Sequence, residues 1–353
     1  MLILVINPGS TSTKIALFEE HDMLFEKTVR HGISETGVHD DIKDQMGMRK
    51  KYVTDFLSQS EVSTKDLDAI VACGGLIKPI DSGTYAINEA MIRDLASASA
   101  AVHASALGGL IANDLASEHS TPAFVVDPIV VDEMDPCAKL TGLPGVERSS
   151  VFHALNTKAI ARRAAAKVGI EYENGRFIVA HMGGGITIGA HMYGRVVDVN
   201  DALSGEGPFT PERCGAVPVT GIISLCYSGK SRQEMMKYVS GGGGMSAYLG
   251  TNDLREVEQM IKSGDEYSAL VVDTMAYQVS KEIGAMSAVL EGRVDAITLT
   301  GGLAYSNRFT SAIKRRVDLI APVHVFPGED EMRALAEGAI RVLSGVEKVK
   351  EYG

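Results

Sequence analysis

Three glycine-rich segments of the chain combine a backbone that a ligand can approach closely with side chains that can donate hydrogen bonds. Residues 7–14 read Asn-Pro-Gly-Ser-Thr-Ser-Thr-Lys, residues 181–185 read His-Met-Gly-Gly-Gly, and residues 299–304 read Leu-Thr-Gly-Gly-Leu-Ala. Backbone N–H groups in such turns can form an anion-binding nest, so each segment is a candidate cradle for a phosphate or a nucleotide. Each segment is also compatible with an ordinary turn, because Asn, Pro, Gly and Ser are common turn formers.

The balance between these two interpretations differs from segment to segment. Taken alone, residues 7–14 favour a plain hairpin turn, and they lack the G-x-x-x-x-G-K-[ST] spacing of a Walker A loop. Three consecutive glycines at 183–185 are costly in conformational entropy, so a turn alone explains them poorly. A similar layout in both halves of the chain favours the phosphate interpretation. Residues 299–304 follow a predicted strand, and ligands of α/β sheets bind at the carboxyl ends of strands.

Four isolated polar residues are further candidates for chemistry. Asp127 ends an apolar strand, where it suits metal or base chemistry, or an Asx turn with the next residue, a proline. Arg213 lies in a loop of turn residues, either as a clamp on a transferring phosphoryl group or as a solvated side chain. His153 is expected early in an apolar helix, where a hydrogen-bonded core histidine is the simpler interpretation. Glu331 is expected near the start of the last helix, where the helix dipole favours a carboxylate.

The predicted elements place these groups on two similar halves of the chain. Strands are expected at residues 2–6, 14–18, 23–30, 69–73, 123–127, 177–182, 186–192, 195–199, 295–299 and 323–326. Helices are expected at 41–59, 103–116, 150–168, 231–239, 265–290 and 329–343, and the glycine run at 241–244 predicts only a helix end. The strand, turn, strand, turn, strand pattern of the first residues restarts near mid-chain. This restart predicts an internal duplication and two related α/β domains.

Composition narrows the classes of function. The length of 353 residues suggests about two domains. The formal net charge of −11, without any run of five Lys or Arg residues, argues against a nucleic-acid binder. A hydrophobic content of 45% excludes wholesale disorder. A dinucleotide-binding dehydrogenase is disfavoured because no G-x-G-x-x-G motif follows the first strand.

Cysteine usage and hydropathy bear on the compartment. The four cysteines form no C-x-x-C pair, which excludes zinc-ribbon and thioredoxin-like motifs. Few, scattered thiols in a chain of this length are typical of a reducing cytoplasm. The apolar residues 1–6 are too few for a signal peptide, and no later apolar run reaches about 18 residues. We therefore expect a soluble, cytoplasmic protein with neither a membrane nor a nucleic acid as partner.

Six segments, taken in order along the chain, resemble the acetate and butyrate kinase family, within the superfamily that includes sugar kinases, actin and heat-shock chaperone ATPases. They are residues 6–14, 125–134, 151–156, 180–185, 207–213 and 299–302. The ordered set spans essentially the whole chain and is more specific than any one motif. The Val-Phe-His-Ala-Leu-Asn segment at 151–156 favours the butyrate kinase branch, because acetate kinases are expected to carry Phe-His-Gly-Thr there.

The resemblance implies a fold and a reaction. The fold is α/β, with two duplicated ribonuclease H-like (actin-like ATPase) domains and a nucleotide cleft between them. Residues 1–148 plus 330–353 would form the acyl and phosphoryl lobe, and residues 149–329 the nucleotide-binding lobe. The reaction is ATP-dependent phosphorylation of a short-chain carboxylate to its acyl phosphate, and the reverse, by direct in-line transfer. Butyrate is the implied substrate, with isobutyrate or propionate as alternatives; ATP or ADP and Mg²⁺ are the implied cofactors, and a homodimer or higher homo-oligomer is the implied assembly.

The resemblance also implies roles for individual residues. The implied catalytic residues are Asn7, His103, Asp127, His153 and Arg213. The implied nucleotide or phosphate contacts are Ser10, Thr11, Ser12, Lys14, His181, Gly183, Gly184, Gly185, Gly301 and Gly302. The implied Mg²⁺ site is formed by Asn7, Asp127 and Glu331. Because Mg²⁺ binds few protein carboxylates and keeps several waters, the two carboxylates are expected to act partly through water.

One position departs from the pattern of the family. Relatives are expected to carry Arg-Gly-Gly where this chain has Cys73-Gly74-Gly75, and the resemblance implies that this arginine holds the substrate carboxylate or phosphoryl group. We hypothesise that Lys78 or Arg148 takes its place. A chain without any such cation would be a catalytically weak nucleotide-binding sensor, which is the alternative from a different class of function.

Overall fold

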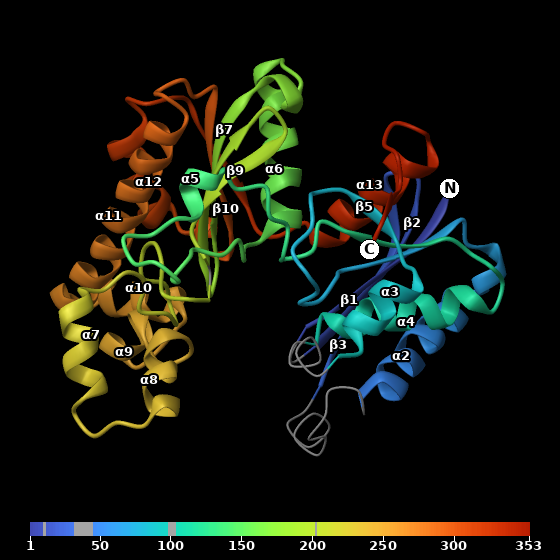
Figure 1. Cartoon of the computed structure of the whole chain (residues 1–353), viewed down its shortest axis with the longest axis horizontal. Helices are drawn as coiled ribbons and strands as arrows, with labels where there is room; N and C mark the ends of the chain where they lie inside the picture. The colour runs from blue at the N-terminus through green and yellow to red at the C-terminus, as the bar shows by residue number, and fades with distance from the viewer. Residues whose placement is uncertain (10–11, 32–44, 98–103, 202) are drawn as a thin grey trace. The chain divides into compact units, whose positions relative to one another are not determined.

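The computed structural model describes residues 1–9, 12–31, 45–97, 104–201 and 203–353. The chain forms two compact units: unit 1 comprises residues 1–131 and 330–353, and unit 2 comprises residues 132–329. Each unit is a mixed α/β structure built around its own sheet (Figure 1). The chain leaves unit 1 once and returns to it, so the C-terminal helix belongs to the same unit as the N-terminal strands.

Unit 1 contains a seven-stranded sheet in the order β12-β5-β6-β4-β1-β2-β3. Its strands are β1 (Leu2–Pro8), β2 (Ser12–Glu19), β3 (Asp22–Arg30), β4 (Ala69–Ala72), β5 (Thr84–Ala86), β6 (Ala123–Val126) and β12 (Lys350–Glu351). Its helices are α2 (Met46–Gln59), α3 (Glu89–Leu95), α4 (Ala106–Ser117) and α13 (Glu331–Leu343). Residues 3–6 of β1 are all buried, as expected of a central strand against which helices, here α4 and α13, are packed.

Unit 2 contains a five-stranded sheet in the order β11-β10-β7-β8-β9. Its strands are β7 (Arg176–Met182), β8 (Ile186–Met192), β9 (Arg195–Val199), β10 (Ala296–Gly301) and β11 (Val323–Pro327). Its helices are α5 (Pro136–Lys139), α6 (Ala154–Val168), α7 (Val219–Cys226), α8 (Arg232–Val239), α9 (Gly244–Leu249), α10 (Leu254–Lys262), α11 (Glu266–Val289) and α12 (Asn307–Val317).

The two sheets share one topology, which confirms the predicted duplication. In unit 1, β1 pairs antiparallel with β2 and parallel with β4, and β2 pairs antiparallel with β3. In unit 2, β7 pairs antiparallel with β8 and parallel with β10, and β8 pairs antiparallel with β9. The second and third strands of each sheet even share a register irregularity, after Leu17 in one and after Ala190 in the other.

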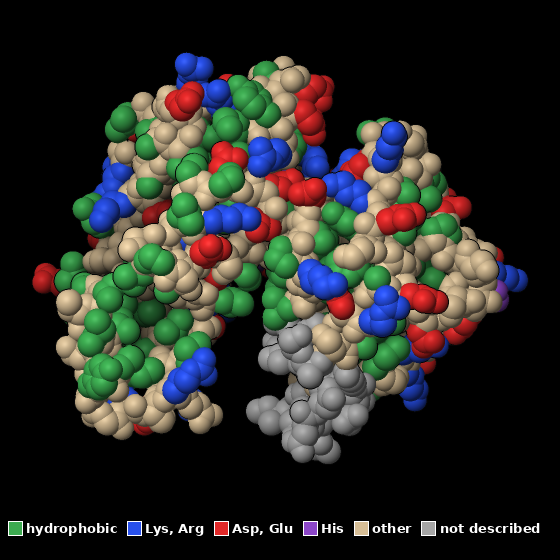
Figure 2. All heavy atoms as spheres, viewed as in Figure 1, with side chains coloured by type: hydrophobic (Ala, Val, Ile, Leu, Met, Phe, Trp, Pro, Cys, Tyr) green, Lys and Arg blue, Asp and Glu red, His purple; other side chains and the backbone are tan. Residues whose placement is uncertain are grey.

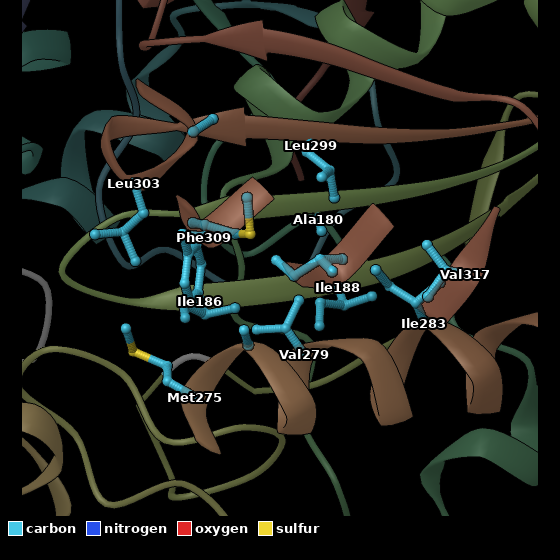
Figure 3. Packing of buried hydrophobic residues seen from close by; sticks show 14 of the residues in the cluster. Ala180, Ile186, Ile188, Met275, Val279, Ile283, Leu299, Leu303, Phe309 and Val317 are labelled. Carbon is cyan, nitrogen blue, oxygen red and sulfur yellow. The ribbon is translucent and has the colours of Figure 1, made fainter. Parts of the chain in front are cut away.

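The core of unit 2 lies between its sheet and α11 (Figure 3). Met275, Val279 and Ile283 are four residues apart along α11, so they share one face of the helix. Figure 3 shows these side chains pointing toward Ile186 and Ile188 of β8. All five side chains are essentially buried, which holds the β7–β8 hairpin firmly on the helix.

The segment 132–148 packs on unit 2, although it was expected in the N-terminal lobe. The backbone N–H of Asp135 donates to the carbonyl of Val197 at 2.9 Å. Farther along, the Arg148 guanidinium lies 2.9 Å from an oxygen of Asp198. Because both contacts are made to β9, the boundary between the two units falls after residue 131 rather than after residue 148.

Several short elements differ from expectation. The strands β5 and β12 pair with each other in parallel and were not expected; neither was α7. The helix expected at 41–59 begins at Met46, and residues 41–44 lie outside the described part of the chain. The helix expected from residue 150 begins only at Ala154. Among the described helices, none combines the length and the apolar character needed to cross a membrane.

Candidate functional site

The glycine turn between β7 and β8 is shaped to accept an arginine. Gly183 donates its backbone N–H to the carbonyl of Gly185 at 2.8 Å, which closes the turn. A Cβ atom placed on Gly185 would lie only 2.8 Å from Cζ of Arg213. Glycine at the third position of the run therefore leaves the space in which the Arg213 guanidinium lies against the backbone of the turn.

Thr210 joins the Arg213 loop to this turn. Its hydroxyl donates to the carbonyl of Gly184 at 2.6 Å, and its oxygen accepts from the backbone N–H groups of Glu212 and Arg213 at 3.1 and 3.0 Å. The side chain is buried. One hydroxyl thus sets the distance between the loop and the glycine turn.

The glycine run at 241–244 supports the same loop from the other side. Gly244 has φ +65°, and a Cβ there would lie 2.7 Å from the carbonyl oxygen of Arg213. The N–H of Met245 donates to the carbonyl of Thr210 at 2.9 Å, and the N–H of Gly241 donates to that of Glu212 at 2.9 Å. The run therefore does more than end a helix: it lets two backbones approach closely around Arg213.

Two histidines stack beside the turn. The rings of His153 and His181 have centroids 3.8 Å apart and planes 14° apart. His153 Nδ1 lies 3.1 Å from the hydroxyl of Thr187, and His181 Nδ1 lies 2.8 Å from Oδ1 of Asn156. Burial, together with His181 and the guanidinium of Arg213, holds the pKa of His153 well below its usual range. His153 is therefore a neutral imidazole near neutral pH.

His181 directs its second nitrogen toward the glycine turn. The residue is fully buried, and its Nε2 makes no hydrogen bond to any described residue. Nε2 lies 3.2 Å from Oε1 of Glu329, and a Cβ on Gly183 would be 3.6 Å from Nε2 and 3.4 Å from the Glu329 oxygen. A buried ring nitrogen and a carboxylate thus converge on the first residue of the turn.

The third glycine segment meets the second at one cavity. Gly301 ends β10 with φ +88°, and a Cβ there would lie 2.7 Å from the carbonyl carbon of Met182, so only glycine fits against the end of β7. Gly302 has open space on its Cβ side. A cavity of about 640 Å³, here called the glycine cavity, is lined by Gly183, Gly184 and Gly302 together with Glu212, Asn252 and Tyr305. Its volume is typical of a site for a small molecule or cofactor.

The first glycine segment lies in unit 1 at the end of β1. Asn7 donates from Nδ2 to Oε2 of Glu331 at 2.7 Å, and it pairs across the hairpin with Lys14. Gly9 donates its N–H to the carbonyl of Ser12 at 2.8 Å. Glu331 lies in the first turn of α13, as expected. Ser10, Thr11 and His103 lie outside the described residues.

Asp127 is held in an unusual backbone conformation just after β6. Its φ is +39°, a value that non-glycine residues rarely adopt and that is concentrated at functional sites. Oδ1 accepts from the hydroxyl of Ser82 at 2.6 Å and from the N–H of Gly83 at 2.8 Å. These partners lie far back in the sequence, so the carboxylate is oriented by the loop before β5 rather than by a local Asx turn.

The two cations expected to stand in for an arginine at position 73 are engaged elsewhere. Lys78 is largely exposed, with Nζ 3.3 Å from Asp94. Arg148 belongs to unit 2, where it contacts Asp198 and Glu206. At the position itself, burial first and Glu331 second raise the pKa of the Cys73 thiol, so this side chain is neutral.

The hydrogen-bond donors of unit 2 suit an anionic ligand, and the side-chain oxygens of Asn7 and Glu331 suit a loosely held Mg²⁺. Within the described residues, no three His, Cys, Asp or Glu side chains are grouped closely enough to hold a metal ion by themselves. Mg²⁺ is usually held by one or two carboxylates with waters and substrate phosphates, and the Asn7–Glu331 pair is of this kind. The open glycine turn, the buried Nε2 of His181 and the guanidinium of Arg213 fit a nucleotide phosphate.

Solved structures match the whole chain. The acetate kinase of Porphyromonas gingivalis has a TM-score of 0.81 at 20% identity, with 97% of this chain and 99% of that chain covered. A propionate kinase of Francisella tularensis subsp. tularensis has a TM-score of 0.75 at 18% identity, with 96% and 98% covered. The acetate kinase of Entamoeba histolytica has a TM-score of 0.75 at 16% identity, with 96% and 99% covered. The fold is therefore the two-domain α/β fold of the acetate kinase class.

A family model refines this class. The model described as the acetokinase family matches residues 139–319, which is more than half of the chain. This protein belongs to the acetokinase family, a family of carboxylate kinases. The match includes the β7–β8 glycine turn, the Arg213 loop and the Gly301–Gly302 turn.

Proposed function

We propose that this protein transfers the terminal phosphoryl group of ATP to the carboxylate of a short-chain acid, and that it catalyses the reverse reaction. One observation carries the proposal: the Arg213 guanidinium lies against the glycine turn that also lines the glycine cavity. A planar cation fixed beside a phosphate-sized turn suits a phosphoryl group whose charge is spread over its equatorial oxygens.

The reaction needs little from the protein except position and charge. A carboxylate oxygen of the acid attacks the γ-phosphorus, the bond from phosphorus to the bridging oxygen breaks, and ADP leaves with that oxygen. The nucleophile is already an anion, so no general base is required, and catalysis rests on orientation and electrostatic stabilisation. Mg²⁺, when bound, neutralises charge on the β- and γ-phosphoryl oxygens.

Named residues of both units take roles in this scheme. Arg213 neutralises charge on the transferring group, and the low pKa of His153 leaves a neutral ring that can hydrogen-bond without adding charge. His181 and residues 183–185 hold phosphate, while Gly301 and Gly302 leave room for the nucleoside. We assign phosphate contacts to Ser10, Thr11, Ser12 and Lys14 of the first hairpin segment, and a catalytic role to His103. Asn7, Asp127 and Glu331 hold Mg²⁺, partly through water.

Butyrate is the substrate that we propose, with propionate or isobutyrate as alternatives. The proposal rests on the Phe-His-Ala-Leu-Asn sequence at 152–156. His153 stacks on His181, and Asn156 hydrogen-bonds to His181, which supports placing this segment near the phosphoryl group. One methylene is worth about 1–3 kcal/mol in a substrate pocket, so the preference for chain length is a matter of about 10- to 200-fold in kcat/KM.

A panel assay tests the proposal. Purified protein with Mg-ATP and acetate, propionate, butyrate, isobutyrate or valerate should form an acyl phosphate, trapped as its hydroxamate, with the highest kcat/KM on butyrate. A higher kcat/KM on another acid would reassign the substrate and leave the reaction intact. Binding of ATP without acyl phosphate from any acid would contradict the enzyme and identify a nucleotide-binding sensor.

We propose that two copies of the chain associate through an apolar face of unit 2. Hydrophobic side chains gather around a hollow over α7, α8 and α9 (Figure 2), where a cavity of about 980 Å³ lies among α7, α8, α9 and α11. Leu225 and Leu270, which line this cavity, are 40% and 60% exposed. Monomers rarely expose a large contiguous apolar patch, and two-fold symmetric self-association is the commonest way to cover one.

Light scattering of the protein at micromolar concentration tests the assembly. The wild type should have the mass of a dimer, and Leu225→Glu with Leu270→Glu should give the mass of a monomer. Leu319→Glu, at an 82% exposed position of unit 2 outside this face, is the matched control and should remain dimeric. A monomeric wild type, or a dimer that survives both glutamates, would contradict the proposed interface.

A cytoplasmic location is part of the same proposal. Cys73, Cys137, Cys214 and Cys226 are all free thiols in the structure, which suits a reducing compartment. Fractionation of source cells should recover the protein with cytoplasmic markers, and recovery with secreted or envelope fractions would contradict it.

A further inference from the structure

Arg49 is a fully buried arginine in unit 1. It lies on α2 with 0% of its side chain exposed and is among the largest completely buried side chains of the described chain. Charged side chains are almost never fully buried unless they are paired. The burial of this guanidinium therefore needs a reason beyond packing.

Within the described part of the chain, the acceptors that hydrogen-bond the guanidinium are all neutral. Nε and Nη2 donate to Oε1 of Gln45 at 3.2 and 2.8 Å, and Nη1 donates to the carbonyl of Ser12 at 3.0 Å and to the hydroxyl of Thr13 at 2.8 Å. Among the ion pairs of the described residues, none includes Arg49. Burial lowers the pKa of Arg49, but an arginine remains protonated at any physiological pH. A fixed positive charge thus lies in the interior, and no carboxylate of the described residues pairs with it.

The charge lies directly behind the turn of the first hairpin. The Ser12 carbonyl that accepts from Arg49 also accepts from the N–H of Gly9 at 2.8 Å, which closes the turn between β1 and β2. Thr13, the second acceptor of Nη1, lies with its hydroxyl 2.9 Å from Nε2 of His31. Arg49 therefore holds, by hydrogen bonds from α2, the segment that carries the proposed phosphate contacts of unit 1.

Position 73 lies within electrostatic range of Arg49 and carries no charge. Arg49 is near enough to lower the pKa of the Cys73 thiol, but burial raises that pKa by more, so the thiol is neutral. A second cation at position 73 would place two positive charges together in a desolvated site. The neutral cysteine is compatible with Arg49 as the cation of this region.

We infer that Arg49 is an electrostatic positioning residue: its buried charge, held by Gln45 and hydrogen-bonded to Ser12 and Thr13, fixes the first hairpin turn and attracts an anionic phosphoryl group to it. This inference rests on the proposed function, because it identifies a source of positive charge for the phosphate contacts of unit 1. A purely mechanical clamp would need the hydrogen bonds but not the charge. The two roles separate when the charge is cancelled while the hydrogen bonds are kept.

The variant Gln45→Glu cancels the charge with little change in shape. It places a carboxylate where the guanidinium now donates twice, at 3.2 and 2.8 Å, so the fold and the hydrogen bonds should persist. Inorganic pyrophosphate in Mg-free buffer, titrated by calorimetry, should bind about tenfold more weakly than to the wild type. The KM for ATP should rise by a similar factor with a smaller change in kcat. Urea unfolding should show stability equal to or greater than that of the wild type.

Direct substitutions and a charge-matched control complete the test. Arg49→Met should weaken pyrophosphate binding at least as much as Gln45→Glu, and Arg49→Lys should recover most of the affinity because it restores the charge. Lys51→Met removes the same charge from an exposed position of α2 and should bind pyrophosphate like the wild type. If Arg49→Met fails to fold, Gln45→Glu alone decides.

Unchanged pyrophosphate affinity in folded Gln45→Glu would overturn the inference, as would an equal loss in Lys51→Met. The proposed function is judged separately, by acyl phosphate formation in the wild type. An inactive wild type with a weakened Gln45→Glu would refute the reaction and keep Arg49 as an anion-positioning residue. An active wild type with unchanged pyrophosphate affinity in Gln45→Glu would support the reaction and refute the role of Arg49.

Discussion

Individual residues of unit 2 hold the Arg213 side chain and its loop in place. The guanidinium takes the space that a Cβ on Gly185 would need, and the Thr210 hydroxyl fixes the loop on the carbonyl of Gly184. Burial lowers the pKa of Arg213, while Glu212 and Asp201 oppose this effect; the side chain stays charged because arginine titrates so high. Such an arrangement holds the cation in place before the substrate arrives.

Replacing Arg213 should therefore affect the chemical step more than binding. Arg213→Gln is expected to lower kcat by about 10³-fold, as for other phosphoryl-transfer arginines, with a much smaller change in the KM for ATP. Arg213→Lys should recover little, because an ammonium cannot reproduce the planar contact. Steady-state kinetics measures both parameters, and Arg293→Gln, at an exposed position, is the control. A loss confined to KM would contradict the assigned role.

Buried histidines in unit 2 make the stability of the protein depend on pH. His191 is fully buried, with Nδ1 2.9 Å from the hydroxyl of Tyr172. Burial first, and then Lys158 and Arg162, hold its pKa well below the usual value of 6.5. His191 is then protonated near pH 6.5 in the unfolded chain but remains neutral at that pH in the folded chain. The stability due to this histidine is present above pH 6.5 and is lost as the pH falls below it, by about 1.4 kcal/mol per pH unit.

The variant His191→Gln tests this linkage. Urea unfolding between pH 7 and pH 5 should show a shallower loss of the free energy of unfolding than in the wild type, by about 1.4 kcal/mol per pH unit. The exposed His119→Gln should keep the wild-type slope. Parallel curves for wild type and His191→Gln would show that His191 does not titrate as its burial implies.

At the scale of elements, the β7–β8 hairpin turn depends on glycine at one particular position. Gly185→Ala would place a methyl group 2.8 Å from Cζ of Arg213, so the side chain must move. A displacement of about 1 Å at a reacting centre costs on the order of 10²-fold in rate, and we expect a loss of that size in kcat. Gly284→Ala, in α11 with nothing within 4 Å of the new atom, is the control. Equal activities for the two variants would contradict the contact.

Elements with strong local patterns could be predicted from the sequence, and elements that depend on distant partners could not. The two hairpins combine β-branched residues with glycine-rich turns, so their strands were expected. The strand β12 has only two residues and exists because it pairs with β5. The helix α7 has the sequence VTGIISLC, in which β-branched residues and a glycine are weak helix formers, so its eight residues give little helical signal.

The same distinction applies to the site. Residues of the glycine turns, Asp127, His153 and Arg213 stand in recognisable motifs. Thr210 lies inside one of these motifs, but its role depends on the carbonyl that its hydroxyl reaches. Arg49 has no sequence signal, because an arginine on a predicted helix is ordinarily solvated; only the three-dimensional structure brings it to Ser12 and Thr13.

At the scale of the whole molecule, one topology occurs twice and carries different chemistry each time. Unit 1 presents Asn7, Asp127, Glu331 and the buried charge of Arg49, and unit 2 presents the glycine cavity, the stacked histidines and Arg213. The chain is acidic, with a net charge of −11, so long-range attraction does not bring a polyanion to it. In the proposed function, the binding of ATP therefore rests on local hydrogen-bond donors in each unit together with Mg²⁺.

Transfer of the terminal phosphoryl group of ATP to a carboxylate oxygen, rather than activation of the acid at another phosphorus, can be tested with an oxygen label. Wild-type protein, Mg-ATP and butyrate labelled with ¹⁸O in both carboxylate oxygens are combined, and the product is observed by ³¹P NMR. We expect an acyl phosphate whose phosphorus is bonded to one ¹⁸O, because a carboxylate oxygen attacks the terminal phosphorus of ATP. Acyl phosphate without ¹⁸O on phosphorus, or ATP cleaved only to ADP and phosphate, would contradict it.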